Sequence, residues 1–567
     1  MSETTDSESE ASFASSAVRP LLMFFLAAFA GLALLMWGLQ VLAGLVGSST
    51  GSAKAIDFEN NSITIYLRQE PPQLDNTRAT DSVSGIVLGH SMEGLTRMDL
   101  QDRLEPGIAE RWEVTTEKAT FWLRKNAKWS DGSTITAHDF VFGWKTVLDP
   151  NTASRYAFLL YPIKNARAVN EGNLPLDDVG IRALDDFTLE VELENPTPFF
   201  DKMMTFQTYY PVQEKFYKST DGKFGAEADK LLSSGPFIVK EWVHGASILL
   251  ERNPHYWDQQ RIHLDSINFG YITSDQTALL NFFKDDKIAY TTLNAENLRD
   301  AMENHWHVSR EQDGTIWYME FNHRPERLTS NHNLRRAIQL VMNMEELVYK
   351  VIKLSGNLPG ESLFPVWLTG VNDYFRKEYP APKIRLDEAL AREHLAKAKE
   401  ELGLDEWPEL VLLADDTPQS SLQAEWVQGT LKSKLGLTIK IDKQIFKQRL
   451  EKSLAGQFDL LNAGWGPDYD DPLTYGDLFA SWNVQNRGRY ANPELDEQVA
   501  ISQNSIDPKT RMDAFDRIQR ILIEDAAILP NYERGVSYVV KPELKNVKRR
   551  VIGAEVDFTN AYLEKEG

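Results

Sequence analysis

The sequence contains no cysteine, and this absence removes several chemistries at once. Disulfide bonds, thiolate catalysis, cysteine zinc sites, iron–sulfur clusters and a lipid-modified N-terminal cysteine are all excluded. No run of Lys and Arg is long enough to form a basic face, and the formal net charge is −22, so nucleic-acid binding is not predicted. The acidity favours solubility; attraction of cationic ligands by long-range steering is the weaker interpretation.

Familiar enzyme motifs are also missing. The chain has no G-x-S-x-G, H-E-x-x-H, P-loop or G-x-G-x-x-G pattern. His305 and His307 form the only close histidine pair, and a solvated strand edge explains them better than a metal site. The acids near Asp468 lack the Gly and distal Glu of an EF-hand loop. The sequence therefore predicts no enzyme, no metal and no other cofactor.

One long apolar run stands near the N-terminus. Residues 1–20 are polar and acidic and are predicted to be disordered. Residues 21–46 carry no formal charge, and a membrane-spanning helix needs about 20 apolar residues. We expect an uncleaved signal-anchor followed by a flexible linker, 47–57, because a signal peptide has an apolar region of only roughly 7–15 residues. Ala53-Lys54-Ala55 fits a cleavage site and keeps the cleaved form as the alternative.

The whole chain has 567 residues, which is too long for one core and predicts two or three domains. Residues 62–67 and 187–193 alternate apolar and polar side chains, as half-buried strands do. Thr136 and Asp139 have capping-box spacing before an apolar helical pattern, and Asp387 is placed to cap a helix that Gly403 ends. Interleaved strands and helices predict mixed α/β lobes rather than a helical bundle or an all-β sandwich.

Residues 463–472, AGWGPDYDDP, follow a buried strand end at 457–461. Asp471 before Pro472 predicts the start of a helix over LTYGDLFA, which leaves Asp468 unexplained by capping. The glycines of the predicted turn let another backbone approach closely, and Trp465 offers a flat apolar wall. The Asp468 carboxylate can hold an ammonium group, such as the amino end of a peptide. On this segment alone, an ordinary turn with an exposed acid is the better interpretation.

An ordered set of such segments changes that weighting, because together they resemble the oligopeptide- and dipeptide-binding proteins of ABC importers, the family 5 extracellular solute-binding proteins. The matching segments are, in chain order, EPPQLD (70–75), MEGLTRMD (92–99), PGIAERWE (106–113), FWLRKNAKWSDGSTITAHDFVFGWK (121–145), DPNTASRYA (149–157), ALDDFTLEVEL (183–193), SSGPFIVKEW (233–242), LERNPHYWD (250–258), AGWGPDYDDP (463–472) and YVVKP (538–542).

The resemblance implies an α/β fold of two lobes joined by a hinge, with an extra subdomain inserted into lobe one. The peptide is expected to lie extended between the lobes, which close over it. An enclosed peptide loses the hydrogen bonds between its backbone and water. Strand addition replaces these bonds whatever the side chains of the peptide are. The expected boundaries are 58–91, 216–290 and 531–567 for lobe one, 92–215 for the inserted subdomain and 291–530 for lobe two.

The resemblance also implies a set of ligand-binding residues. Asp468 is expected to hold the ligand α-ammonium, Trp465 to form a wall and Gly464 to make strand contact. Weaker candidates are Tyr156, Phe446, the Ser234-Gly235 backbone and Tyr532. Oligopeptide binders often carry basic residues where this chain has Asn462 and Ser453, so ligand length and the anchor for the ligand carboxylate stay open.

The expected function is capture of short peptides outside the cytoplasm and delivery to ABC permease and ATPase subunits. We expect a monomer anchored by one helix at the extracytoplasmic face of the inner membrane, without nucleic-acid partners. Three alternatives stay open: a peptide sensor or chaperone-like binder not coupled to transport, a binder of a non-peptide solute, and a hydrolase, which no motif supports.

Overall fold

The computed structural model describes residue 31 and residues 54–565. The predicted polar tail 1–20, almost all of the predicted spanning helix 21–46 and the linker residues 47–53 lie outside the described residues. Among the helices of the described part, none is long and apolar enough to cross a membrane.

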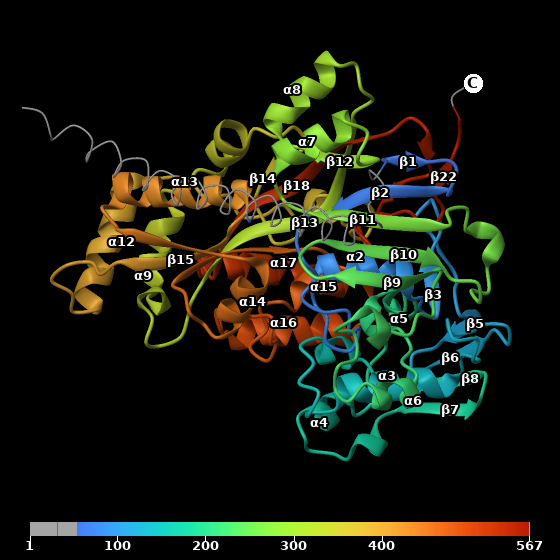
Figure 1. The fold of residues 1–567 in the computed structure, drawn as a ribbon. Helices are drawn as coiled ribbons and strands as arrows, with labels where there is room; N and C mark the ends of the chain where they lie inside the picture. The colour runs from blue at the N-terminus through green and yellow to red at the C-terminus, as the bar shows by residue number, and fades with distance from the viewer. Residues whose placement is uncertain (1–30, 32–53, 566–567) are drawn as a thin grey trace, which may run out of the picture. The chain divides into compact units, whose positions relative to one another are not determined.

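Three sheets organise residues 54–565 (Figure 1). A five-stranded sheet has the order β1-β2-β11-β10-β9, in which β11 runs parallel to β2. A larger sheet has the order β12-β18-β13-β17-β15-β16, with the short β14 also paired to β18. An antiparallel four-stranded sheet has the order β5-β6-β8-β7.

The strand bounds follow in chain order: β1 Ile56–Asp57, β2 Ser62–Leu67, β3 Thr96–Met98, β4 Leu104–Pro106, β5 Ala109–Val114, β6 Lys118–Leu123, β7 Ile181–Asp185, β8 Thr188–Glu192, β9 Phe237–Val243, β10 Ser247–Arg252, β11 Ser266–Ile272, β12 Tyr290–Leu293, β13 Ser309–Phe321, β14 Leu358–Pro359, β15 Leu410–Asp415, β16 Ile439–Gln444, β17 Leu460–Trp465, β18 Ile528–Val540, β19 Leu544–Lys545, β20 Lys548–Arg549, β21 Val556–Asp557 and β22 Tyr562–Leu563.

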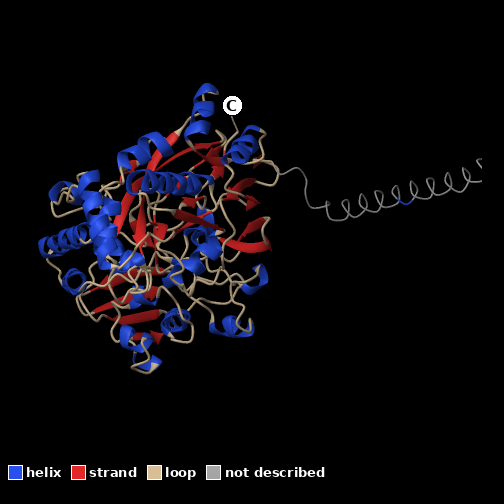
Figure 2. Cartoon of the chain, turned by 90° about the vertical axis from the view of Figure 1, so that its left-hand side faces the viewer, coloured by secondary structure: helices blue, strands red, loops and turns tan. Residues whose placement is uncertain are grey.

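Helices lie mainly on the outside of these sheets (Figure 2). The α-helices are α2 Ser82–Ser91, α3 Ala137–Leu148, α4 Ala166–Asn170, α5 Phe200–Met203, α6 Glu214–Ser219, α7 Gln276–Lys284, α8 Ala295–Glu303, α9 His332–Gln339, α10 Met344–Glu346, α11 Phe375–Glu378, α12 Glu388–Glu401, α13 Pro418–Leu435, α14 Phe446–Leu454, α15 Leu473–Gly476, α16 Pro493–Asn504 and α17 Pro508–Glu524.

Local sequence signals account for several of these elements. The alternating segments form β2 and β8, as predicted. Helix α3 begins where the capping box predicts, since the Asp139 carboxylate accepts from the Thr136 backbone N–H at 2.8 Å. Helix α12 begins after Asp387, whose side chain accepts from the Leu390 N–H. The mixed α/β architecture predicted from the sequence is confirmed.

Three local predictions are corrected by the structure. Strand β17 continues through Gly464 and Trp465, so the turn begins only at Gly466. The helix after Pro472 is a single turn, α15, which covers Leu473–Gly476 and not the whole of LTYGDLFA. His305 has a left-handed backbone (φ 57°) in the turn that ends α8, so the histidine pair does not lie on a strand.

Two long strands, β13 and β18, connect different parts of the described chain. They pair with each other, with register shifts between Gln312 and Ile316 and between Trp317 and Tyr318. Strand β18 continues through the boundary expected at 530/531, so part of the last segment assigned to lobe one belongs to the larger sheet.

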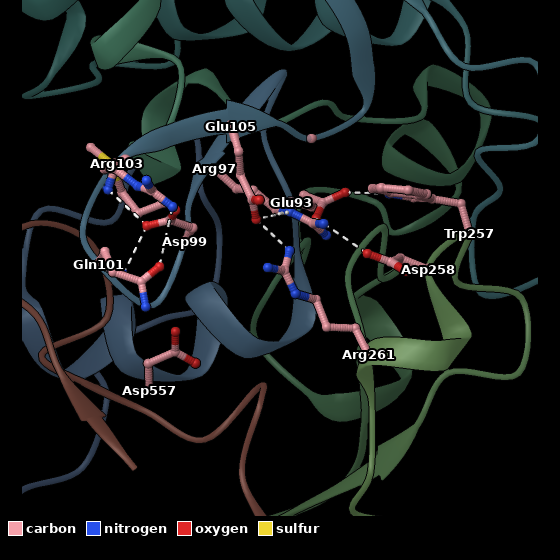
Figure 3. A network of polar contacts seen from close by, with 12 residues as sticks. Glu93, Arg97, Asp99, Gln101, Arg103, Glu105, Trp257, Asp258, Arg261 and Asp557 are labelled. Carbon is pink, nitrogen blue, oxygen red and sulfur yellow. Dashed lines mark hydrogen bonds and ion pairs between the residues drawn. The ribbon is translucent and has the colours of Figure 1, made fainter. Parts of the chain in front are cut away.

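A polar network surrounds the β3–β4 hairpin (Figure 3). The Arg97 guanidinium donates to Glu93, Glu105 and Asp258 at 3.2, 2.9 and 2.7 Å. Glu93, itself buried, also accepts from the Trp257 indole at 2.6 Å. Because each buried charge has a partner, we interpret this network as structural support rather than a ligand site.

Candidate functional site

The candidate site begins at a strand edge that is only partly used. Strand β17 pairs with β13 along its whole length, from Leu460 to Trp465. On its other side it pairs with β15 only at Leu460 and Leu461, although β15 continues to Asp415. Within the described residues, Asn462 to Trp465 therefore have no strand partner on that side, and an extended chain could add there.

Gly464 lies on this edge for a packing reason. A Cβ at this position would come within 3.0 Å of the Trp317 ring. Trp317 in turn stacks on Tyr532, with ring centroids 6.0 Å apart. Any larger side chain at 464 would push on this aromatic pair.

Asp468 follows the turn after β17 and is buried, with 5% of its surface exposed. Its backbone N–H donates to Thr474 Oγ1 at 2.9 Å, which fixes the loop. Its carboxyl Oδ1 accepts from the Tyr156 hydroxyl at 3.1 Å, while Oδ2 has no hydrogen-bond partner among the described residues. Burial raises the pKa of Asp468 to about 8. A buried carboxyl with an unpartnered oxygen can be satisfied by a cationic ligand group.

Aromatic side chains enclose this carboxyl. The Trp465 indole N–H donates to the Thr474 carbonyl at 2.8 Å. Its ring lies edge-on to Tyr156, with centroids 6.2 Å apart, and Tyr156 also packs edge-on against Phe206. The structure thus brings together three residues chosen from the sequence, Asp468, Trp465 and Tyr156, from segments more than 300 positions apart.

A second buried acid, Asp477, lies close enough to interact with Asp468. Burial, followed by the negative charges of Asp468 and Asp471, raises the pKa of Asp477 well above its usual value. Asp471 is already paired with Arg511 at 2.6 Å. The surroundings of Asp468 therefore favour a positive charge, and the sequence offered no sign of the contribution of Asp477.

A second group of buried polar residues lies at β13, α14 and the loop before α16, and it was not identified from the sequence. Each of these side chains has at least one buried polar atom without a hydrogen-bond partner among the described residues. They are Tyr318, Glu320, Arg449, Gln485 and Arg487, and we call them the polar cluster. Burial raises the pKa of Glu320 to about 7.

The weaker candidates for ligand binding, Phe446, Tyr532, Ser234 and Gly235, make their contacts with residues other than Asp468. Phe446 begins α14, half-buried, with the Arg449 guanidinium 5.4 Å from its ring centre. The buried Tyr532 hydroxyl accepts from Gln419 Nε2 at 3.0 Å. The Gly235 N–H donates to the Ser91 carbonyl at 3.0 Å, and Ser234 Oγ accepts from a backbone N–H at 3.1 Å. The Gly235 N–H and carbonyl therefore both make hydrogen bonds within the chain, and the contribution of the Ser234-Gly235 backbone to ligand binding stays a prediction.

Contacts across the site join the loop after β17 to the region of the four-stranded sheet. Lys202 forms an ion pair with Asp470 at 2.6 Å. Phe199 stacks on Tyr469, with ring centroids 5.5 Å apart and planes 1° from parallel. Trp482 packs near Tyr161 at 5.9 Å. These contacts hold the two regions together around Asp468.

The remaining surface offers neither a second ligand site near Asp468 nor a metal site among the described residues. A surface hollow of about 480 Å³ lies between α12 and α13, with Trp426 and Lys434 in its lining, and contains none of the site residues. Among the described residues, no group of three or more His, Asp or Glu side chains could hold a metal ion.

The family of the chain follows from comparison with known proteins. Residues 103–487 match the model of the bacterial extracellular solute-binding proteins, family 5. The dipeptide-binding protein DppE of Bacillus subtilis is 30% identical over 91% of this chain and 97% of its own length. The oligopeptide-binding protein OppA of the same organism is 31% identical over 91% of this chain and 95% of its own. The chain therefore belongs to family 5 of the bacterial extracellular solute-binding proteins.

Solved structures agree with the two-lobed fold implied by the sequence. The substrate-binding domain of an oligopeptide ABC transporter from Bacillus anthracis has a TM-score of 0.85 at 32% identity, covering 89% of this chain and 99% of that one. Listeria monocytogenes OppA bound to peptide has a TM-score of 0.84 at 30% identity, covering 90% of this chain and 100% of that one.

The arrangement of the lobes can be compared through a single relative. The murein tripeptide-binding protein MppA of Escherichia coli matches with a TM-score of 0.81, at 26% identity, over 90% of this chain and 100% of that one. Its unliganded open form matches with only 0.61, over 91% of this chain and 99% of that one. The described residues are therefore arranged unlike the open form, which agrees with the burial of Asp468.

Proposed function

We propose that the protein captures short peptides between its lobes outside the cytoplasm and delivers them to an ABC importer. The observation that carries this proposal is the buried Asp468 carboxyl, with one unpartnered oxygen, beside the open edge of β17. The carboxyl suits a peptide ammonium, and the strand edge suits the first peptide groups. Relatives named as peptide-binding proteins and peptide-bound structural neighbours support the same function.

The ligand site in this proposal consists of Asp468 for the ammonium, Gly464 for strand contact, and Trp465 and Tyr156 as walls. Phe446, Tyr532 and the Ser234-Gly235 backbone are more peripheral. Native mass spectrometry of the protein purified from its source, followed by release and sequencing of bound molecules, tests it directly. Recovery of short peptides supports the proposal. Recovery of a non-peptide solute, with no binding of added tri- to pentapeptides, would contradict it.

The division of the chain is part of the proposal. We place lobe one at 58–91, 216–290 and 531–567, the inserted subdomain at 92–215 and lobe two at 291–530, with strand β18 crossing the last boundary. The four-stranded sheet falls inside 92–215, which supports the inserted subdomain. Limited proteolysis with and without peptide would locate the segments that become protected when the lobes close.

The membrane anchor is proposed from sequence alone. Residues 21–46 are uncharged and long enough to span a bilayer, and a tether would raise the effective concentration of the binder near its permease. The protein would then stand as a monomer on the extracytoplasmic face of the inner membrane. Intact-mass measurement of the membrane-extracted protein is expected to give the full chain, whereas a mature N-terminus near Ile56 would establish cleavage and a soluble form.

Two of the similar proteins support alternative functions. YgiS of E. coli, described as a probable deoxycholate-binding periplasmic protein, is 26% identical over 83% of this chain and 88% of its own, which favours a non-peptide solute as the second candidate. The pheromone receptor PrgZ has a TM-score of 0.84 at 28% identity over 89% of this chain and 100% of that one, which favours a peptide receptor as a further candidate. Peptide uptake by membrane vesicles carrying the cognate permease separates transport from sensing.

A further inference from the structure

Two arginines of the polar cluster are buried although some of their guanidinium N–H groups have no hydrogen-bond acceptor among the described residues. Arg487 is 7% exposed, and its Nε and Nη1 atoms have no hydrogen-bond partner among the described residues. Its one side-chain hydrogen bond is a long one, 3.4 Å to Gln485 Oε1. Arg449 is 5% exposed; its Nε donates to Asp415 at 3.1 Å, and its Nη1 has no partner. Burying guanidinium N–H groups without acceptors is costly, so such groups indicate an anion that is bound at another stage of function.

The arginines are near the ammonium site. Burial raises the pKa values of Tyr156 and Tyr318, and the nearby positive charge of Arg487 partly opposes the rise in both. Tyr156 is also the residue whose hydroxyl contacts Asp468. Tyr318 pairs across the sheet with Ala463, next to the open edge of β17. The arginines therefore belong to the same buried region as Asp468, at the ligand-facing part of the seven-stranded sheet.

The charges in this cluster leave an excess of positive charge. Arg449 is neutralised in part by Asp415, and Glu320 is the other acid nearby. Glu320 accepts from the Gly488 N–H, and burial raises its pKa to about 7, so it carries only part of a negative charge at neutral pH. Arg155 adds a positive charge beside Arg487, and Glu451 lies near Arg155 as a further acid, so the two charges largely offset each other there and the excess comes from Arg487. A bound carboxylate would offset this excess and accept from the free guanidinium N–H groups.

We propose that Arg449 and Arg487 hold a carboxylate of the ligand, so that the site binds both a positive and a negative group. This inference rests on the proposed peptide function. The carboxylate comes either from the peptide C-terminus or from an acidic side chain, and both present the same chemistry to the guanidinium groups.

The experiment uses the full chain in detergent micelles and a pool of tri- to pentapeptides prepared in two forms, free acid and C-terminal amide. Native mass spectrometry measures the retention of each form by the native protein, by R487Q and by R449Q. The half-exposed, ion-paired Arg517 supplies the matched control R517Q. We expect the native protein and R517Q to prefer acids over amides on the order of 30-fold, and R487Q and R449Q to lose at least tenfold of that preference.

Each outcome decides the inference. If the native protein retains acids and amides equally, whatever their side chains, the inference is wrong although peptide binding stands. If it retains amides that contain Asp or Glu, and R487Q does not, the arginines bind a side-chain carboxylate. If no peptide is retained, the peptide function fails and the inference fails with it.

A second measurement separates ligand binding from a structural role. Since the guanidinium of Arg487 is buried with unpartnered N–H groups, R487Q is expected to raise, or leave unchanged, the melting temperature of the peptide-free protein. Peptide should then raise that temperature less than in the native protein. A lower melting temperature of peptide-free R487Q together with an unchanged acid preference would assign Arg487 to structure alone.

Discussion

Replacement of Asp468 by Asn is expected to remove both the ammonium site and its pH dependence. In the structure, burial raises the pKa of Asp468 to about 8, so this carboxyl is mostly protonated at pH 7. An ammonium ligand favours the ionised form, and peptide binding must therefore release a proton. Each pH unit below the pKa costs the native protein about 1.4 kcal/mol, or tenfold in affinity.

The pH profile follows from these values. Affinity of the native protein for a free-amine peptide should rise about tenfold per unit between roughly pH 5 and 7. It should level off near pH 8, where Asp468 is ionised and the peptide α-amino group, with a pKa of about 7.7–8.0, begins to lose its own proton. At pH 8 the Asp468→Asn variant should bind at least about 30-fold more weakly, because a buried charge pair is broken. The difference should shrink as the pH falls.

The Asp468 carboxyl lowers the stability of the peptide-free protein as the pH rises, whereas it raises peptide affinity. Its pKa in the folded state lies above the unfolded value of 3.8, so the stability it contributes is present below about pH 4 and is lost as the pH rises through about 8. Peptide-free Asp468→Asn should therefore be more stable than the native protein at pH 8. This gain also shows that any loss of peptide affinity does not come from misfolding.

Isothermal titration calorimetry in buffers of different ionisation enthalpy measures affinity and proton release together. An N-acetylated peptide, which has no ammonium group, is the matched control and should bind both proteins weakly with no dependence on pH. A native affinity that stays flat from pH 5 to 8, or equal binding of free and N-acetylated peptides, would refute the assignment of Asp468.

Three further predictions concern other parts of the molecule. Glu93→Ala should destabilise the protein in urea by about 3–5 kcal/mol, because it strands the partners of a buried charge, while peptide affinity stays unchanged; a loss below 1 kcal/mol would contradict the role of the network. Lys202→Ala removes a half-exposed ion pair with Asp470 and should lower peptide affinity by less than about fivefold in calorimetry, whereas a loss above 30-fold would mean that this contact governs closure. Treatment with a chelator should leave affinity unchanged; a loss that one metal restores would disprove metal independence.

Local signals in the sequence account for much of the fold. The capping box at Thr136 and Asp139 places the start of α3, and the alternation in residues 62–67 gives β2 with its bounds. These predictions succeed because capping and strand alternation depend on residues a few positions apart. The sequence places the end of β17 too early, because Gly464 suggests a turn. In the structure Gly464 lies within the strand and makes room for the ring of Trp317, which is distant in sequence.

The site could be predicted only in part for the same reason. Asp468 and Trp465 stand in one recognisable segment, whereas Arg487 and Glu320 carry no local signal and meet only in the folded chain. The sequence left the carboxylate anchor open because Ser453 and Asn462 are neutral. In the structure Arg449 lies one helical turn before Ser453 on the buried face of α14. A shift of one turn keeps a side chain on the same face of a helix, but sequence positions alone do not tell whether that face meets the ligand.

The open edge of β17 has a cost when no ligand is bound. The backbone N–H and C=O groups of Asn462 to Trp465 have no strand partner on the β15 side, and an unpaired strand edge is a template for pairing with another chain. Whenever the lobes separate, this protein exposes the kind of surface from which aggregates grow. Peptide supply should then act as a solubility factor: starved preparations, held at high concentration, should aggregate faster than preparations saturated with peptide, and light scattering can follow the difference.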